Sequence, residues 1–398
     1  MSMKAHSGAT STPTRLPNKV LSIGLATALV GTIAPVCAGP SIEFGDQGFI
    51  NITYGLQLWS QYSNYTSAAD SGSDYDTFLR RNRLTFAGQY NDYVGFYAQL
   101  EAGNDSKAGE DDKSVFYRDA YLTLDYNDAV RFIAGRFKNT FSRENLEACL
   151  EPLTLDRSTL SYTPFGGTRD TGVAMWGNLA DAAFQYRVMV SDGREGDAVV
   201  KSSPRLTARV HWSPLDAEYD YGYRGTYLGT RKILTIGAAY DYQADVVYAD
   251  YPTRSDPKDY KAWTADIFSE YPTSVGTFTG SAAIFDYDTG SAILKNPDPD
   301  LRINSDLEGY YIKAGYMLPK PVGIGRLQFF ARHEERDYIY PEDQYDNTWN
   351  SIGANYYIDG QQLKVTFEYT DIDFDAPDPT NNLLQDQKLA TLALQFIF

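Results

Sequence analysis

The last fourteen residues of the chain, 385–398, alternate between apolar side chains and smaller or polar ones. Aliphatic or aromatic residues occupy Ala390, Leu392, Leu394, Phe396 and Phe398, with threonine, alanine or glutamine between most of them. This period of two predicts a β-strand with one apolar face. A terminal strand with an uncovered apolar face promotes aggregation in a soluble protein. A closed barrel in a membrane removes the free edge and places the apolar face in lipid.

The first 38 residues differ in composition from the rest of the chain. Three basic side chains precede an apolar run over 20–30, which is too short to span a bilayer, and small residues follow it. These features predict a secretory signal peptide over residues 1–38 and one mature domain over residues 39–398. A lipoprotein anchor at Cys37 is a disfavoured alternative, because the residues before it make a poor lipobox.

The mature chain is acidic and rich in aromatic residues. Removing the three basic residues of the leader leaves 32 of the 35 Lys and Arg against 52 Asp and Glu, a net charge of −20. Only Cys149 remains, so we expect no disulfide within the chain. No later segment approaches 18 consecutive apolar residues, so we expect no transmembrane helix. The 32 tyrosines and 20 phenylalanines suit aromatic girdles at two membrane interfaces.

Alternation recurs along the chain and predicts roughly sixteen strands. A clear pair covers 77–90 and 93–102, joined by a short turn at Asn91 and Asp92. Tight turns alternate with long polar connections, as in outer-membrane barrels with short turns on one rim and long loops on the other. Segment 213–230 strains this pattern because it is long for a turn. We therefore expect an all-β transmembrane antiparallel barrel, with a soluble β-sandwich as the alternative.

Placing the apolar face of each strand in lipid assigns the other face to a polar lumen. One interpretation of its charges is a lattice of neighbouring ion pairs. The more specific one is that arginines guide anions, because guanidinium stays charged and matches phosphate or carboxylate oxygens. The expected basic pore-lining residues are Arg81, Arg83, Arg187, Arg205, Arg209, Lys313, Arg326, Arg332, Arg336 and Lys364, with Arg131 less clear. The expected lumen acids are Glu101, Asp119, Asp125, Asp241, Asp266, Glu270, Glu334 and Glu368.

Residues 129–176 carry a recognisable pattern. Gly-x-Phe-Lys at 135–138 leads into Phe-Ser-x-Glu-x-Leu at 141–146, and Arg-Asp-x-Gly-Val follows at 169–173. These motifs, together with upstream RRNRLTF and RDAYLTLDY and the final LQFIF, resemble the phosphate-selective porin O and P family. The resemblance implies a sixteen-stranded homotrimeric outer-membrane porin. In such a porin, the loop over 138–168 folds inward and sets the constriction.

The resemblance also implies that basic residues form an anion path at this loop. Three basic residues face four acidic ones there, a balance that does not predict tight selectivity for orthophosphate. The expected constriction residues are Lys138, Arg143, Glu144 and Arg157, and the other acids are Glu147, Glu151 and Asp156.

We expect no catalytic residue, metal site or cofactor. The mature chain keeps His211 and His333, which show neither metal-ligand spacing nor a nucleophile motif. Cys149 has no basic partner near it in sequence and is interpreted as a filler. Two acidic connections, 337–347 and 371–386, are interpreted as solvated or as bridged by divalent ions to lipopolysaccharide.

The sequence therefore predicts a passive diffusion channel of a bacterial outer membrane. Its expected partners are membrane lipid, lipopolysaccharide, two further copies of the chain and small anionic solutes such as phosphate or other oxyanions, without nucleic acid. The alternatives are a general or cation-tolerant porin, a structural or partner-binding barrel and, disfavoured, a barrel enzyme.

Overall fold

The computed structural model describes residues 39–66, 72–102, 114–163, 167–290, 306–338, 346–378 and 384–398. The predicted leader lies outside these residues. A short strand, β1 (Ser41–Phe44), precedes a series of longer ones. These are β2 (Gly48–Tyr65), β3 (Ser73–Gln89), β4 (Val94–Ala102), β5 (Val115–Asn127), β6 (Val130–Lys138), β7 (Arg169–Leu179), β8 (Phe184–Ser191), β9 (Arg205–Trp212), β10 (Ile233–Asp250), β11 (Ser255–Thr273), β12 (Gly276–Asp288), β13 (Leu307–Met317), β14 (Arg326–Tyr338), β15 (Asn347–Asp359), β16 (Leu363–Phe374) and β17 (Gln387–Ile397). The short helical elements are α1 (Arg143–Leu146), η1 (Thr159–Ser161) and η2 (Gly196–Ala198).

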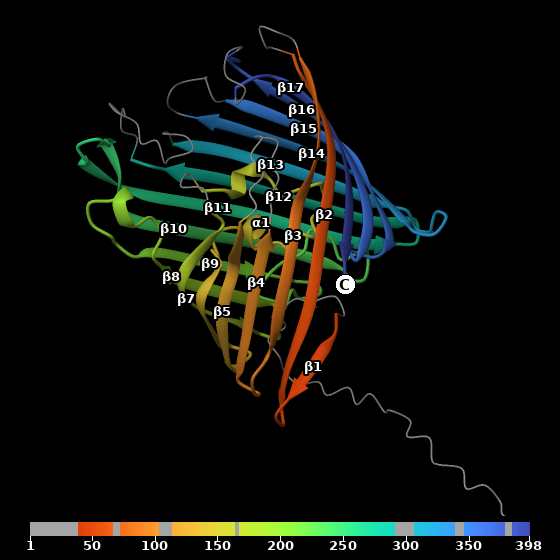
Figure 1. Cartoon of the computed structure of the whole chain (residues 1–398), viewed down its shortest axis with the longest axis horizontal. Helices are drawn as coiled ribbons and strands as arrows, with labels where there is room; N and C mark the ends of the chain where they lie inside the picture. The colour runs from red at the N-terminus through yellow and green to blue at the C-terminus, as the bar shows by residue number, and fades with distance from the viewer. Residues whose placement is uncertain are drawn as a thin grey trace, which may run out of the picture.

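Across the described residues, the sixteen strands β2–β17 form one closed antiparallel barrel. Each strand pairs with its neighbours in chain order, and β17 pairs with β2 to close the ring. Figure 1 shows this junction, with orange β2 beside blue β17. β1 pairs with β2. The predicted all-β barrel of about sixteen strands is confirmed. None of the helices described is long and apolar enough to cross a membrane.

The closing strand has the two faces that its sequence predicts. Leu392 and Leu394 are exposed on the outer surface, whereas Thr391 and Gln395 are buried on the inner one. The final residue extends the pairing, because the Phe398 N–H donates to the Tyr54 carbonyl at 3.1 Å and the Phe398 carbonyl accepts from the Tyr54 N–H at 3.0 Å. The ladder therefore continues to the last residue, which leaves no free apolar edge.

Asparagine side chains build two of the predicted tight turns. Asn91 Oδ1 accepts from the Val94 N–H at 2.9 Å, and Asn127 Oδ1 accepts from the Val130 N–H at 2.8 Å. Such bonds let asparagine replace a backbone acceptor within a turn. They fix the hairpins β3–β4 and β5–β6 at one rim.

Residues 213–232, called here the inner segment, join β9 to β10 at the same rim but fold into the barrel. Thr226 Oγ1 donates to Glu270 of β11 at 2.7 Å, and Tyr223 Oη accepts from Arg187 of β8 at 2.8 Å. Both partners lie on the inner faces of their strands. The unusual length of this connection is therefore used to fill the lumen.

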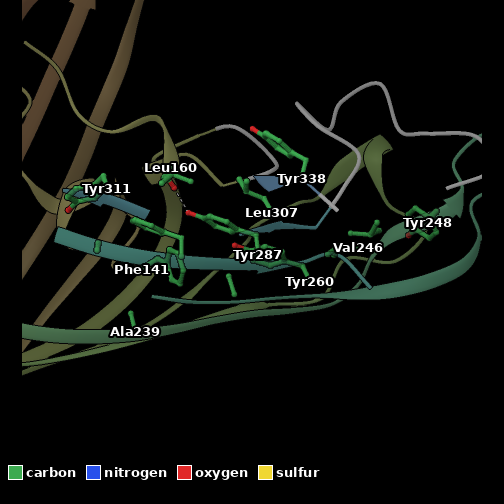
Figure 2. Close-up of a cluster of buried hydrophobic side chains, with 14 of the residues drawn as sticks. Phe141, Leu160, Ala239, Val246, Tyr248, Tyr260, Tyr287, Leu307, Tyr311 and Tyr338 are labelled. Atoms are coloured by element: carbon green, nitrogen blue, oxygen red, sulfur yellow. Dashed lines mark hydrogen bonds between the residues drawn. The ribbon is translucent and has the colours of Figure 1, made fainter. Parts of the chain in front are cut away.

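An aromatic cluster inside the barrel holds the loop between β6 and β7 against β12 and β13. Phe141 and Leu160 of the loop are buried among Tyr287 of β12 and Tyr311 of β13. Figure 2 shows the Tyr287 hydroxyl donating to the Leu160 carbonyl, a bond of 2.5 Å. Apolar and aromatic contacts of this kind add burial energy to the polar bonds that anchor the loop.

Candidate functional site

The loop over 138–168, called here the constriction loop, begins with a compact turn built by its sequence motif. Ser142 caps α1, because its Oγ accepts from the Asn145 N–H at 3.0 Å. The Asn145 amide donates to the carbonyls of Asn139 at 2.6 Å and Thr168 at 3.1 Å, which ties the two ends of the loop together. Lys138 donates to the carbonyls of Leu146 and Glu147. The residues of the sequence motif therefore hold the two ends of the constriction loop together.

Polar contacts anchor the constriction loop to strands on several sides of the barrel. The Leu155 N–H donates to Glu368 of β16 at 3.0 Å, and Glu144 pairs with Lys313 of β13. Arg80 and Arg81 of β3 both bind Asp156 at 2.7 Å. These anchors stretch the loop across the lumen, which agrees with its predicted inward fold.

The inner segment meets the constriction loop inside the barrel and forms one unit with it. Tyr223 pairs with Glu147 in a parallel bridge, and the Gly225 N–H donates to the Glu151 carbonyl at 3.0 Å. Arg143 Nη1 and Nη2 donate to the two carboxylate oxygens of Glu218 at 2.7 and 2.8 Å. Such a two-pronged pair fixes geometry as well as charge. The constriction is therefore built by two segments from opposite rims.

The ten basic residues predicted to line the pore all lie on inner faces, and most are engaged in ion pairs. When neighbouring basic and acidic side chains form ion pairs, a lumen can hold many charged groups while its net electrostatic field stays small. The pairs are Arg81–Asp156, Arg83–Glu101, Arg205–Asp241, Arg209–Asp266, Lys313–Glu144, Arg332–Glu368 and Arg336–Glu334. Arg187, Arg326 and Lys364 donate instead to carbonyl oxygens of Tyr221, Leu228 and Leu150.

Arg187 and Arg209 lie behind the inner segment and not on an open surface. Their guanidinium groups and His211 Nδ1 all meet the hydroxyl of Tyr223, at 2.8, 3.2 and 2.6 Å. Each of the three side chains is at most 2% exposed. In this conformation a solute in the lumen does not contact them. The sequence placed them on the inner wall but gave no sign that a second segment covers that wall.

The basic and acidic residues predicted for the constriction hold the loop in place. Arg143 binds Glu218, Glu144 binds Lys313, and Arg157 Nη1 donates to the Asn145 carbonyl at 3.1 Å. Of the four residues predicted for the constriction, Arg143, Glu144 and Arg157 are less than 5% exposed, and Lys138 is partly exposed. Their predicted role in selecting anions stays a prediction, and their contacts assign them a structural role first.

A cavity of about 230 Å³ remains beside these two segments, against the wall formed by β17 and β2–β7. Aromatic side chains cover much of one side, and basic side chains gather where the cavity meets the constriction loop. The aromatic residues are Tyr97, Tyr121, Phe137, Trp176, Tyr221 and Tyr223, and the basic ones are Arg83, Lys138 and Arg169. This cavity is the candidate site for a passing solute.

Cys149 lines the basic end of this cavity, where the fold gives it partners that its sequence neighbourhood lacks. Burial alone would raise the pKa of the thiol, but four surrounding cations lower it well below its ordinary value. These are Arg157, Lys138, Arg83 and Arg169. Arg83 and Arg169 come from strands distant in sequence, so the sequence around Cys149 does not reveal them, and the interpretation of Cys149 as a filler stays a prediction.

Sequence reasoning missed three further arginines that face the interior. Arg80 turns inward beside Arg81 because a β-bulge interrupts the alternation of β3 at this point. Arg118 lies at a second irregularity, between β4 and β5, and binds Glu101. Arg169 donates to both oxygens of Asp119 at 3.2 Å. Bulges leave no reliable mark in the sequence, whereas Arg169 lies in the recognised Arg-Asp motif.

Of the two retained histidines, His211 is buried inside, and His333 faces outward as its parity predicts. His333 Nε2 lies 3.2 Å from the Tyr310 hydroxyl, and its Nδ1 lies 2.8 Å from Asn350 Oδ1. Within the described ranges no three histidine, cysteine or carboxylate side chains converge in a way that could hold a metal ion.

A model of a known family matches nearly half of the chain. Residues 52–232 match the model of the family described as phosphate-selective porin O and P. The resemblance predicted from the motifs is thereby confirmed. A protein of Aquifex aeolicus (strain VF5), described as uncharacterized, is 21% identical over 397 residues, which cover 90% of this chain and 85% of the relative.

Solved outer-membrane proteins share the fold at low sequence identity. The channel DcaP of Acinetobacter baumannii is 15% identical with a TM-score of 0.55, over 91% of this chain and 100% of its own. OmpT of Vibrio cholerae, in trimer form, is 12% identical with a TM-score of 0.55, over 89% and 100%. An anion-selective porin from Comamonas acidovorans is 11% identical with a TM-score of 0.54, over 88% and 100%. At these identities the likeness establishes the barrel fold.

Proposed function

We propose that this chain, which carries the phosphate-selective porin O and P pattern over residues 52–232, is a passive outer-membrane channel for small hydrophilic solutes, mainly anions. A closed barrel with an apolar exterior and polar interior suits a water-filled path through lipid. Two solved structures with the same fold, an outer membrane channel and an anion-selective porin, support this assignment.

The observation that carries the anion preference is the pairing of the charges that line the cavity. The lining acids Asp119, Asp125 and Glu151 are each held by an arginine, Arg169, Arg131 and Arg224. Lys138, at the basic end of the cavity, donates instead to the carbonyl oxygens of Leu146 and Glu147. A cation bound by carbonyl groups in a narrow path of low dielectric attracts anions and repels cations.

The test is the reversal potential of the purified channel in a planar bilayer under a KCl gradient. We expect a modest preference for chloride that decreases at higher salt, because screening shortens the reach of the fixed charges. Lys138→Gln removes a cation that lines the cavity and should reduce this preference. Lys388→Gln is the matched control, since Lys388 is an exposed lysine at the start of β17. A clear preference for potassium in the unmodified channel would refute the assignment.

Assembly and export form part of the same proposal. A homotrimer in the outer membrane is supported by the trimer form of a structure with the same fold. Export by a signal peptide over 1–38 is testable by N-terminal sequencing of the mature protein, which should begin at Gly39. The acidic connections 337–347 and 371–386 are proposed to bind lipopolysaccharide through divalent ions. We assign no enzymatic activity.

A further inference from the structure

The cavity has an aromatic wall that a channel for small inorganic anions does not need. Tyr97 of β4 and Tyr121 of β5 are direct cross-strand partners, and their rings stack with centroids 5.1 Å apart and planes inclined by 11°. Phe137 of β6 meets the edge of Tyr121 at 5.9 Å. Three neighbouring strands therefore contribute one continuous aromatic surface.

The inner segment supplies an aromatic group on the other side of this wall. The Tyr221 ring lies 5.5 Å from Trp176 and 6.3 Å from Phe137, with an edge-to-face arrangement in both pairs. Phe137 and Trp176 are buried, whereas Tyr97, Tyr121 and Tyr221 keep part of their surface open to the cavity. These three tyrosine rings therefore keep surface that a solute in the cavity can contact.

Hydrogen-bond donors stand next to this aromatic surface. Arg83 donates its Nε to Glu101 at 3.0 Å. Among the residues described here, no hydrogen bond uses its two terminal amino groups. Lys138 has three donor positions and places two on carbonyl oxygens of the constriction loop. One carboxylate could therefore accept from both side chains without breaking an existing ion pair.

The chemistry of the two surfaces selects a solute that is partly apolar and flat. Orthophosphate gains from donors but is strongly hydrated and gains nothing from tyrosine faces. An aromatic ring gains from offset stacking and from removal of its surface from water. A cavity of about 230 Å³ holds one such ring with its acid group.

We propose that this cavity is a binding subsite for small aromatic carboxylates, with the ring against Tyr97 and Tyr121 and the carboxylate at Arg83 and Lys138. The inference rests on the proposed channel function and specifies its substrate class. Such a subsite would hold the solute between the constriction and the short-turn rim, and would release it readily because neither surface encloses the solute completely.

The test compares benzoate with cyclohexanecarboxylate, which has the same charge but no aromatic face, at neutral pH. Each acid is titrated against the chloride current of single channels in planar bilayers. We expect benzoate to reach half-block at a concentration at least tenfold lower than cyclohexanecarboxylate or acetate. Tyr121→Leu should remove this difference, because it replaces the central ring of the wall by an aliphatic side chain. Tyr240→Leu is the control, since Tyr240 lies on the outer face of β10.

A second measurement separates this inference from the proposed channel function. Calorimetric titration of the detergent-solubilised barrel with benzoate needs no ion current, and Arg83→Gln should weaken the binding at least fivefold. Equal affinity for benzoate and cyclohexanecarboxylate in both measurements would overturn the subsite, even if the channel proves anion-selective. A barrel that conducts no ions but binds benzoate through Tyr121 would overturn the channel and keep the subsite.

Discussion

The contact between Glu218 and Arg143 predicts how strongly the inner segment is held in the lumen. Glu218 is 1% exposed and accepts from Arg143, from the Tyr227 hydroxyl at 2.6 Å and from the Thr235 hydroxyl at 2.6 Å. Burial alone would raise the pKa of Glu218, but the Arg143 guanidinium lowers it to about 2. The carboxylate therefore stays ionised across the usual range of bilayer recordings.

Glu218→Ala leaves the charge of Arg143 buried without its main partner. Removing one member of a buried ion pair costs about 3–5 kcal/mol. Three backbone hydrogen bonds join the inner segment to the constriction loop, from Ala148, Tyr223 and Gly225 N–H groups. At about 1 kcal/mol each, these bonds contribute a similar amount. A loss of about 3 kcal/mol raises the ratio of displaced to seated segment roughly a hundredfold.

Single-channel recording measures this displacement directly. We expect Glu218→Ala to show a larger mean conductance and frequent transitions between two current levels, with Glu218→Gln intermediate because the amide keeps the shape of the side chain. Asp216→Asn is the control, since it removes the same charge from an exposed position in the same segment. A folded Glu218→Ala barrel with the conductance and noise of the unmodified channel would refute the reasoning.

Two further results are expected. Leu160→Ala opens a cavity where the constriction loop packs against β12, at a cost of about 2–5 kcal/mol. Current noise should therefore rise in this variant but not in Leu392→Ala, which changes the outer face. Equal noise in both variants would exclude Leu160 as an anchor of the loop. Burial and the neighbouring Glu144 carboxylate raise the pKa of Glu147 to about 7, above its ordinary 4.5. The stability that protonated Glu147 contributes is therefore fully present below about pH 4.5 and is lost as the pH rises through 7. Reversal potentials should shift toward anion preference from pH 8 to pH 6, and a shift of the same size in Glu147→Gln would rule this residue out.

The barrel could be predicted from sequence because apolar and polar residues alternate along each strand with a period of two. Arg81 and Arg83 on β3 face inward as predicted, and both are buried. Thr85 follows the same parity, and His333 lies outward beside the inward Arg332 of β14. Alternation is a local property set by the pleat of the backbone, so it survives without knowledge of the neighbours.

The interior could not be predicted to the same extent because it depends on contacts between distant segments. The length of 213–230 was noticed, but nothing local indicates that Glu218 meets Arg143. The bulge that turns Arg80 inward lies between two strands with otherwise regular alternation. Cys149 looked isolated because two of its cations, Arg83 and Arg169, arrive from other strands.

The position of the inner segment also has a consequence for the order of assembly. The inner segment lies in the middle of the chain and fills the lumen. The barrel closes where β2, its first strand, pairs with β17, its last strand. Once that seam has formed, a buried segment tied to β8, β9 and β11 has no lateral way in. Packing from the side is therefore possible only before β17 pairs with β2, and packing after closure has to proceed along the barrel axis from the short-turn rim.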